Sequence, residues 1–245
     1  MENIIELQNV SKIYQMGTEK VVALNNINLT IKPGEFCCLL GTSGSGKSTL
    51  LHLMAGLEKP TKGQIRIKDK RVETMTEKQL TGFRQKYIGF VFQSFNLLPT
   101  LTALENVELP LVFKGIPRSK RKKEAAAMLQ AVGLGNRLHH KPSQMSGGQQ
   151  QRVGIARAFI TNPEIIFADE PTGNLDSRTT REIMNLICSI ARKNKQTVVL
   201  VTHDIELAEY ADKIIHIRDG SIEKIEMNTN KVGGAQSAET KQTVV

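Results

Sequence analysis

The chain contains no tryptophan, and aromatic residues of all kinds make up only 4% of its 245 residues. Long apolar runs are missing as well, since the longest candidates, such as Val107 to Phe113, are interrupted by Glu108 and Pro110. A helix that crosses a bilayer needs roughly 18 consecutive apolar residues. The sequence therefore predicts a chain that does not span a membrane, with enough length for one or two domains.

Cysteine is scarce too. Cys37, Cys38 and Cys188 form neither an even set of disulfide partners nor a pair of metal-binding knuckles, so we expect three reduced core residues. The first six residues alternate and carry acidic side chains, without the basic start and apolar stretch of a secretory signal. Synthesis is therefore expected to end in the cytosol.

Acidic residues are outnumbered by basic ones, with 24 Asp and Glu against 33 Lys and Arg and a net charge of +9. Such a charge permits phosphate-bearing partners or an anionic membrane surface, and it does not choose between them. A basic stretch, 118–123, either lies against an anionic leaflet or is an ordinary solvated helix face. Both interpretations stay open at this point.

Short apolar runs alternate with helical patterns along most of the chain. Runs of four or five residues, apolar at consecutive positions, are typical of strands buried on both faces of a parallel sheet. They occupy residues 36–40, 88–92, 165–168 and 198–201. Between them, Ser177 to Lys193 has apolar residues at spacings of three and four, which predicts a helix ending at Asn194. The predicted fold class is α/β.

Two regions depart from this alternation. Residues 4–10, 21–31 and 64–68 alternate like antiparallel strands and predict a small side sheet. The region from about 94 to 142 predicts a helical insertion, in which Gly133 stops a helix. The tail, 228–245, is polar and is predicted to be mobile.

A glycine-rich loop lies between the apolar run ending at Leu40 and a helical pattern over 49–57, which is the setting of a phosphate-binding loop. The loop comprises Gly41, Thr42, Ser43, Gly44, Ser45, Gly46, Lys47, Ser48 and Thr49. Its glycines let backbone N–H groups surround an anion, Lys47 reaches the β and γ phosphates, and Ser48 ligates Mg²⁺. A flexible turn is the alternative, but the flanking strand and helix favour nucleotide binding.

Two adjacent carboxylates, Asp169 and Glu170, follow the run 165–168 at the end of a strand where open α/β sheets bind ligands. Taken alone, such a pair is more often a solvated turn. Beside a phosphate loop, Asp169 is predicted to hold the Mg²⁺ shell through water, and Glu170 to polarise the water that attacks the γ phosphate.

The segment 145–152, with sequence MSGGQQQR, resembles the signature of ABC-type ATPases. In that family the start of the following helix caps the γ phosphate of a nucleotide held by a second subunit. The resemblance assigns this role to Ser146, Gly147, Gly148 and Gln149. Met145 stands where the family usually has Leu, and its similar volume should preserve the site.

Four further residues match family positions in the expected order. Tyr14 resembles the aromatic residue that stacks on adenine, although it is alternatively an ordinary strand residue. Gln93 resembles the glutamine that contacts Mg²⁺ and the attacking water and links the core to the helical insertion. Asp176 resembles a residue that communicates across the dimer, and it can also cap the next helix. His203 resembles the switch histidine that contacts the γ phosphate.

The resemblance covers residues 1–227 and implies a RecA-like phosphate-loop NTPase fold. The mostly parallel core is expected over about 1–93 and 160–227, with an N-terminal antiparallel subdomain, and the helical subdomain over about 94–159. Residues 171–176 and 93–99 look most like the macrolide-exporter and lipoprotein-releasing branch, which includes cell-division and antimicrobial-peptide-resistance ATPases.

This branch implies an ATPase that uses ATP and Mg²⁺, forms an ATP-dependent homodimer and drives a separate integral-membrane permease at the cytoplasmic face of the membrane. A helix of the permease would dock beside Gln93, near Phe95, Leu97 and Leu98, unless those residues only fill the core of the insertion. Nucleic acid is not an expected partner. The alternatives are a nucleic-acid-linked ABC ATPase, which the positive charge would suit, and a non-hydrolysing module that gates a partner. The cargo and its direction do not follow from the sequence.

Overall fold

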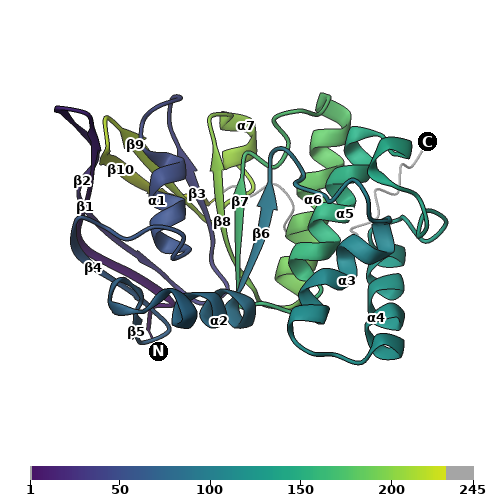
Figure 1. The fold of residues 1–245 in the computed structure, drawn as a ribbon. Coiled ribbons are helices and arrows are strands. Elements are labelled where there is room, and N and C mark those ends of the chain that lie inside the picture. Colours follow the sequence, from purple (N-terminus) through teal and green to yellow (C-terminus); the bar gives the residue numbers. More distant parts are fainter. Residues whose placement is uncertain (1, 230–245) are drawn as a thin grey trace, which may run out of the picture.

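A computed structural model describes residues 2–229 (Figure 1). Two sheets and seven helices make up these residues, together with 3₁₀ turns at Val72–Thr74 and Pro142–Gln144. In chain order the elements are β1 (Ile5–Met16), β2 (Glu19–Ile31), β3 (Phe36–Leu40), α1 (Lys47–Met54), β4 (Lys62–Ile67), β5 (Lys70–Arg71), α2 (Glu77–Tyr87), β6 (Ile88–Phe92), α3 (Ala103–Phe113), α4 (Arg118–Ala131), α5 (Gly147–Phe159), β7 (Ile165–Asp169), α6 (Ser177–Lys193), β8 (Thr197–Thr202), α7 (Ile205–Ala208), β9 (Lys213–Arg218) and β10 (Ser221–Met227).

The main sheet has the order β10-β9-β3-β8-β7-β6, in which every neighbouring pair is parallel except the β9–β10 hairpin. All residues of β3 and β8 are buried, as their uninterrupted apolar sequences require for strands covered on both faces. The four predicted parallel strands are therefore confirmed. The sequence pattern does not predict β9 and β10 as part of this sheet, because β10 is largely exposed and polar.

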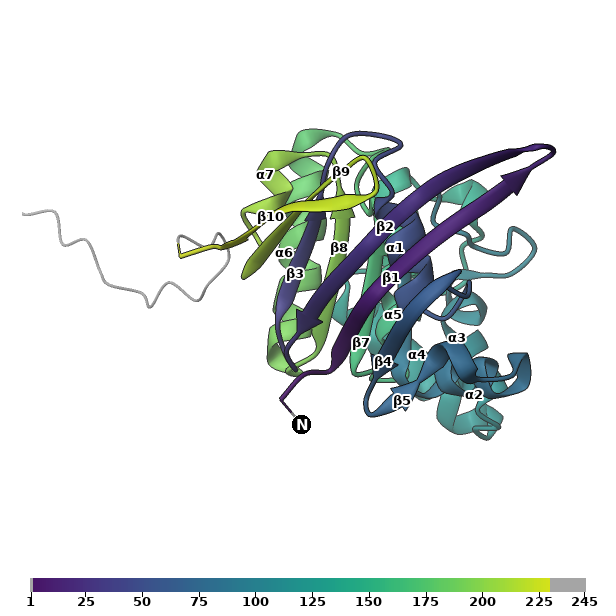
Figure 2. The same cartoon turned by 90° about the vertical axis from the view of Figure 1, so that its left-hand side faces the viewer.

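The smaller sheet is antiparallel, with the order β2-β1-β4-β5, and confirms the predicted N-terminal subdomain. Figure 2 shows it in front of α1. One hydrophobic cluster joins Ile5 and Ile65 of this sheet, Leu50 and Leu53 of α1, and Val199 of the main sheet. The helix that begins at the phosphate loop thus fills the space between two sheets, which fixes its position.

Helices α3, α4 and α5 form the lobe on the right of Figure 1 and correspond to the predicted insertion. They share a core that includes Val107, Leu129 and Val153. The basic stretch 118–123 forms the first turns of α4 and is mostly exposed, with Arg121 Nε bonded to Glu108 Oε2 at 2.9 Å. This lobe lies beside the sheet edge formed by β6.

All three cysteines are buried and free, as expected, and burial raises the pKa of Cys38 and Cys188 to about 12. Asn228 is held by a bond from its backbone N–H to Asp212 O at 2.9 Å. The rest of the predicted mobile tail, from residue 230 on, lies outside the described residues. None of the helices within residues 2–229 combines the length and the apolar character needed to span a bilayer.

Candidate functional site

The phosphate loop connects the end of β3 to the first turn of α1 and is supported by backbone from two other strands. The N–H of Gly220, in the turn between β9 and β10, donates to Ser45 O at 3.0 Å. Gly46 has a φ of 102°, and a Cβ there would lie 2.6 Å from Ala23 O of β2. Only glycine fits this conformation and this close approach. The shape of the loop is therefore set by β2 and the β9–β10 turn as well as by its own sequence.

A cavity of about 990 Å³ lies against this loop. Gln93, Glu170 and His203, from the ends of three different strands, face the same cavity. Its lining comprises Val21, Val22, Ala23, Leu40, Gly41, Thr42, Ser43, Gly44, Gly46, Lys47, Ser48, Thr49, Gln93, Glu170, His203, Ile205 and His216. The structure thus brings together most of the residues predicted to bind nucleotide. Ser45 is the loop residue that does not line the cavity, since its side chain is buried.

Some lining residues were not predicted. Val21 and Val22 are apolar residues that are 43% and 54% exposed at the cavity wall, and Ile205 is 71% exposed. His216 also reaches the cavity from β9. No motif marks these positions in the sequence, because Val21, Val22 and His216 lie on strands placed by pairing with distant segments, and Ile205 begins the short helix α7 after β8.

Lys47 is the first residue of α1, and its side chain is folded back over the loop. Its Nζ donates to Thr42 O at 2.7 Å, and the residue is only 6% exposed. A buried ammonium group with one bonded carbonyl has capacity for two more acceptors. Phosphate oxygens in the adjacent cavity would supply them.

Ser48 and Asp169 fit a magnesium ion. Ser48 Oγ donates to Asp169 Oδ1 at 3.2 Å across the gap between α1 and the end of β7. A hydroxyl and a carboxylate are the oxygen ligands that Mg²⁺ accepts alongside phosphate and water. Burial raises the pKa of Asp169, although the Ser48 hydrogen bond opposes this, and a nearby cation would offset the same desolvation.

Glu170 is aimed differently from its neighbour Asp169 because its backbone turns at the strand end. Its φ of 45° is unusual for a residue other than glycine. The carboxylate Oε1 lies 2.8 Å from His203 Nδ1, and the Thr202 hydroxyl donates to Oε2 at 3.4 Å. Strained backbone of this kind is concentrated at active sites. Glu170 and His203 therefore form a hydrogen-bonded pair at the wall of the cavity.

Tyr14 lies beside the cavity and is not part of its lining. It pairs with Val21 across β1 and β2, and Val21 does line the cavity. Its hydroxyl donates to Glu58 Oε2 at 2.7 Å. Tyr14 is half-buried next to the part of the cavity wall that Val21 forms.

Ser146 and its neighbours lie elsewhere. Ser146 caps α5, where its Oγ accepts from Gln149 N at 3.4 Å and its own N–H donates to Gln149 Oε1 at 3.1 Å. Gly147 and Gly148 form the first turn of that helix. None of these four residues lines the cavity beside the phosphate loop. A helix start is a favourable position for an anion, and the binding of a second phosphate here stays a prediction.

Asp176 caps α6, since its Oδ1 accepts from the backbone N–H groups of Arg178 and Thr179. The Thr179 hydroxyl donates to its Oδ2 at 2.6 Å, and these bonds lower the pKa of Asp176. The capping role that the sequence left open is confirmed. The role of Asp176 across a dimer stays a prediction.

Residues 24–173 match the family described as ABC transporter. The chain belongs to this family. The matched region contains the phosphate loop, Gln93, the helix that follows Ser146, and both Asp169 and Glu170. This ABC transporter chain is a nucleotide-binding ATPase subunit.

Its relatives include whole proteins of the same size. An uncharacterized ABC transporter ATP-binding protein of Thermotoga maritima is 51% identical over 92% of this chain and 96% of that protein. The macrolide export ATP-binding/permease protein MacB of Chlorobaculum tepidum is 47% identical over 89% of this chain, but only 33% of that longer protein. The similarity agrees with the predicted macrolide-exporter branch.

A solved structure is also similar to this chain in fold and in sequence. The ATP-binding cassette MJ0796 of Methanocaldococcus jannaschii, a dimer in a post-hydrolysis state bound to ADP and Pi, has a TM-score of 0.85. It is 48% identical, and the match covers 91% of this ABC transporter chain and 98% of that chain. The predicted ABC-type fold is confirmed.

Proposed function

We propose that two copies of this chain bind two MgATP between them and that hydrolysis drives a separate export-type permease from the cytoplasmic face of the membrane. The proposal is carried by the separation of its two phosphate-binding surfaces, because Ser146 at the start of α5 does not line the cavity that Lys47 lines. A second chain turned head to tail would supply the missing surface. The dimeric state of MJ0796 supports this arrangement.

In this proposal the two lobes divide the work. Residues 1–93 and 160–227 hold the nucleotide, and residues 94–159 present the Ser146 helix start to the partner's γ phosphate. Thr42, Ser43 and the other loop residues surround the phosphates with backbone N–H groups, and Tyr14 stacks on the base. Asp176 contacts the opposite subunit.

Hydrolysis follows from the residues around the cavity. Glu170 orients a water molecule for in-line attack on the γ phosphorus and takes up its proton, while the bond to the leaving oxygen of ADP breaks. Lys47 and His203 stabilise the charge on the phosphoryl oxygens, and Gln93 positions the water. Glu170 Oε1 is hydrogen-bonded to His203, so a turn of His203 toward the γ phosphate would free that oxygen for the attacking water.

Ser48, Asp169 and Gln93 would hold Mg²⁺ with oxygens of the triphosphate, where the ion supplies neutralising charge for the phosphates. Asp169 and Ser48 support this assignment because their oxygens already lie 3.2 Å apart. Gln93 lines the same cavity.

The decisive experiment replaces Glu170 with Gln, which keeps the size of the side chain and removes the base. The variant should bind MgATP, hydrolyse it at least about 100-fold more slowly, and elute as a dimer in gel filtration. Ser146→Arg in the same background is the matched control, because it blocks the opposite face of the nucleotide and should restore the monomer peak. A Glu170→Gln chain that stays monomeric and hydrolyses ATP at the full rate would refute the scheme.

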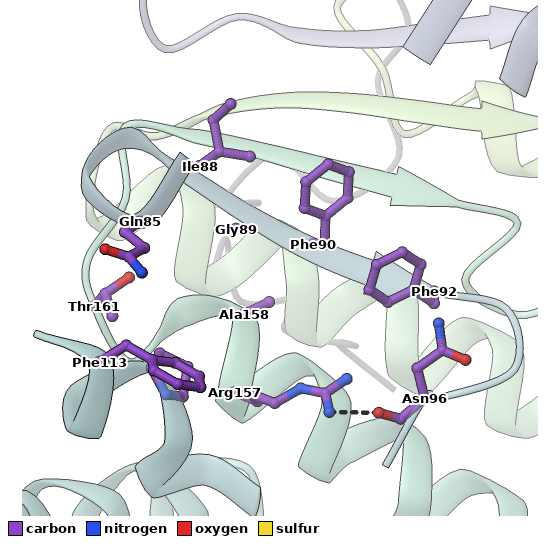
Figure 3. Close-up of a pocket in the computed structure, with 11 residues that line it drawn as sticks. Gln85, Ile88, Gly89, Phe90, Phe92, Asn96, Phe113, Arg157, Ala158 and Thr161 are labelled. Atoms are coloured by element: carbon purple, nitrogen blue, oxygen red, sulfur yellow. Dashed lines mark hydrogen bonds between the residues drawn. The ribbon is translucent and has the colours of Figure 1, made fainter. Parts of the chain in front are cut away.

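The partner surface is proposed to be a groove between β6 and α3 (Figure 3). The groove has a volume of about 300 Å³ and combines aromatic side chains with a few polar ones: Phe90, Phe92 and Phe113 with Gln85, Asn96 and Arg157. Phe113 is 68% exposed at this groove, so a partner that covers it would bury a large apolar side chain. Arg157 is fixed by bonds from its guanidinium to the carbonyls of Phe95 and Asn96.

We propose that the occupant is a short cytoplasmic helix of the permease with an apolar side chain for this groove. MacB relatives, in which this chain matches about a third of the ATP-binding/permease protein, support a permease partner. Of the residues predicted to dock it, Leu97 packs with the helical core instead, Phe95 is half-buried, and Leu98 is 47% exposed. No nucleic acid is expected to bind, which stays a prediction.

The groove is tested by capture from detergent-solubilised membranes with the Glu170→Gln chain as bait. Adding Phe113→Asp should abolish recovery of a multi-span permease identified by mass spectrometry. Adding Met227→Asp should not, since Met227 is 64% exposed but lies on β10. Equal recovery with both variants would contradict the assignment of the groove.

A further inference from the structure

Glu58 lies in the turn after α1 and collects three polar groups that the roles above do not explain. Its Oε2 accepts from Tyr14 Oη at 2.7 Å and from Lys12 Nζ at 3.0 Å. Its Oε1 lies 3.5 Å from Nδ1 of His52, in the last turn of α1. The carboxylate is half-buried. It therefore ties β1 to the helix that carries the phosphate loop.

The Tyr14 ring is held by a contact with its face as well as by the hydrogen bond of its hydroxyl. Lys12 precedes it by two residues, so both side chains lie on the same face of β1. Lys12 Nζ lies 4.9 Å from the ring centroid and also donates to Lys59 O at 2.9 Å. An ammonium at this distance is attracted to the ring face. One face and the hydroxyl end of the ring are therefore fixed together.

The protonation states keep this contact in place. Burial raises the pKa of Tyr14, and the bond to Glu58 raises it further, so the phenol stays protonated as a donor. Burial favours a higher pKa for Glu58, but the bonds from Tyr14 and Lys12 outweigh it and hold the pKa below its usual value. A neutral donor on a charged acceptor makes the bond stronger than one between neutral groups.

The fixed ring borders the nucleotide cavity. Tyr14 pairs with Val21, which lines the cavity, and the Thr49 hydroxyl, from another lining residue, also interacts with the Tyr14 hydroxyl. A base that stacks on an aromatic ring gains affinity only if the ring presents the correct plane. What holds the ring plane therefore controls how well a purine is bound.

We propose that Glu58, assisted by Lys12, is a positioning residue for the nucleotide base, which it serves by fixing the plane of the Tyr14 ring. The inference rests on the proposed function, because it needs Tyr14 to be the surface on which the base stacks. Glu58 does not touch the nucleotide. It acts through Tyr14 and leaves the phosphate chemistry unchanged.

The test compares ATP with tripolyphosphate, which has phosphates and no base. Glu58→Ala should raise KM for ATP about five- to tenfold with kcat unchanged, since stacking is worth at least about that much in affinity. The inhibition constant of tripolyphosphate should stay at the wild-type value. In Glu58→Gln the amide oxygen still accepts from Tyr14, so KM should return toward wild type.

A matched control and a spectroscopic measurement exclude a merely structural effect. Glu73 is another half-buried carboxylate beside the small sheet, bonded to Arg71 and to Ile65 N, and Glu73→Ala should leave KM unchanged. The chain has three tyrosines and no tryptophan. In a Tyr87→Phe, Tyr210→Phe background, the tyrosine fluorescence therefore comes from Tyr14 alone. Glu58→Ala should increase this fluorescence, because a carboxylate that accepts a hydrogen bond from a phenol quenches its emission.

Each unfavourable result has a distinct meaning. If Tyr14→Ala raises KM for ATP and Glu58→Ala does not, the role of Glu58 is refuted while the proposed function stands. If Glu58→Ala weakens tripolyphosphate as much as ATP, Glu58 supports the loop rather than the base, and the inference fails. If Tyr14→Ala leaves KM unchanged, the stacking role in the proposed function is wrong, and the inference falls with it.

Discussion

Gly173 lies against the side chain of Gln93, and this contact allows a sharp test of what Gln93 does. A Cβ added at Gly173 would stand 2.7 Å from Gln93 Nε2 and 3.3 Å from its Cδ. The backbone of Gly173 is not in the left-handed region, so alanine fits its conformation without strain. Gly173→Ala therefore acts on one target, the amide of Gln93.

The size of the effect follows from the distances. Ordinary contact with a Cβ begins at 3.4 Å, so the amide must retreat by about 0.7 Å, the difference from 2.7 Å. Misplacing a positioning group by about 1 Å can cost roughly 100-fold in rate. We expect kcat to fall about 10- to 100-fold, which corresponds to about 1.4–2.7 kcal/mol in the barrier. The free energy of unfolding should not fall, because Gly→Ala at a compatible site stabilises by about 0.4–1 kcal/mol.

Phosphate release at saturating ATP measures the loss, and thermal unfolding verifies the fold. Gly82→Ala on α2 is the matched control, because no atom lies within 4 Å of the added Cβ and activity should be unchanged. The double variant Gln93→Ala, Gly173→Ala should be no slower than Gln93→Ala alone. Wild-type kcat in Gly173→Ala, or losses that multiply in the double variant, would refute this reasoning.

Three further predictions concern a metal ligand, a buried amide and the thiols. Burial raises the pKa of Asp169, so this carboxylate takes up a proton at a higher pH than an exposed aspartate does. The Mg²⁺ concentration for half-maximal ATPase activity should therefore rise as the pH falls from about 8 to about 5. A Mg²⁺ requirement that does not change with pH would contradict the assignment. The fully buried side chain of Asn106 accepts a hydrogen bond from Leu98 N and donates to three backbone carbonyls. Asn106→Ala should therefore lower the free energy of unfolding by about 2–3 kcal/mol and Tm by about 4–12 °C in a thermal scan. Burial raises the pKa of Cys38 and Cys188 to about 12, so iodoacetamide should alkylate no cysteine of the folded chain by mass spectrometry, and rapid labelling would disprove the packing.

The parallel strands and α6 were predictable because their patterns are local. Phe36–Leu40 is apolar throughout, and Ser177–Lys193 has helical spacing with Asp176 before it and Asn194 after it. By contrast, β9 and β10 could not be found in this way. Ser221–Met227 has no regular alternation, since two charged residues separate Ile222 from Ile225, and it is mostly exposed, so its place in the main sheet depends on pairing with β9.

The site was predictable where its chemistry needs particular residue types in a row, as in the loop from Gly41 to Thr49. It was not predictable where ordinary residues reach the cavity through sheet pairing, as Val21 and His216 do. Glu58 is a similar case. Its contacts with Tyr14 and Lys12 span more than forty positions in sequence, and a lone glutamate in a turn carries no signal of them.

In the proposed function, the phosphate loop and the Ser146 helix start lie on separate lobes, so one chain alone carries half of each catalytic centre. We therefore expect a solitary chain to hydrolyse little ATP until a second copy binds it. The rate of ATP hydrolysis per molecule should then rise with protein concentration. A membrane partner that brings two copies together should raise that rate in the same way. Dimer assembly itself would thus limit ATP hydrolysis that is not coupled to transport.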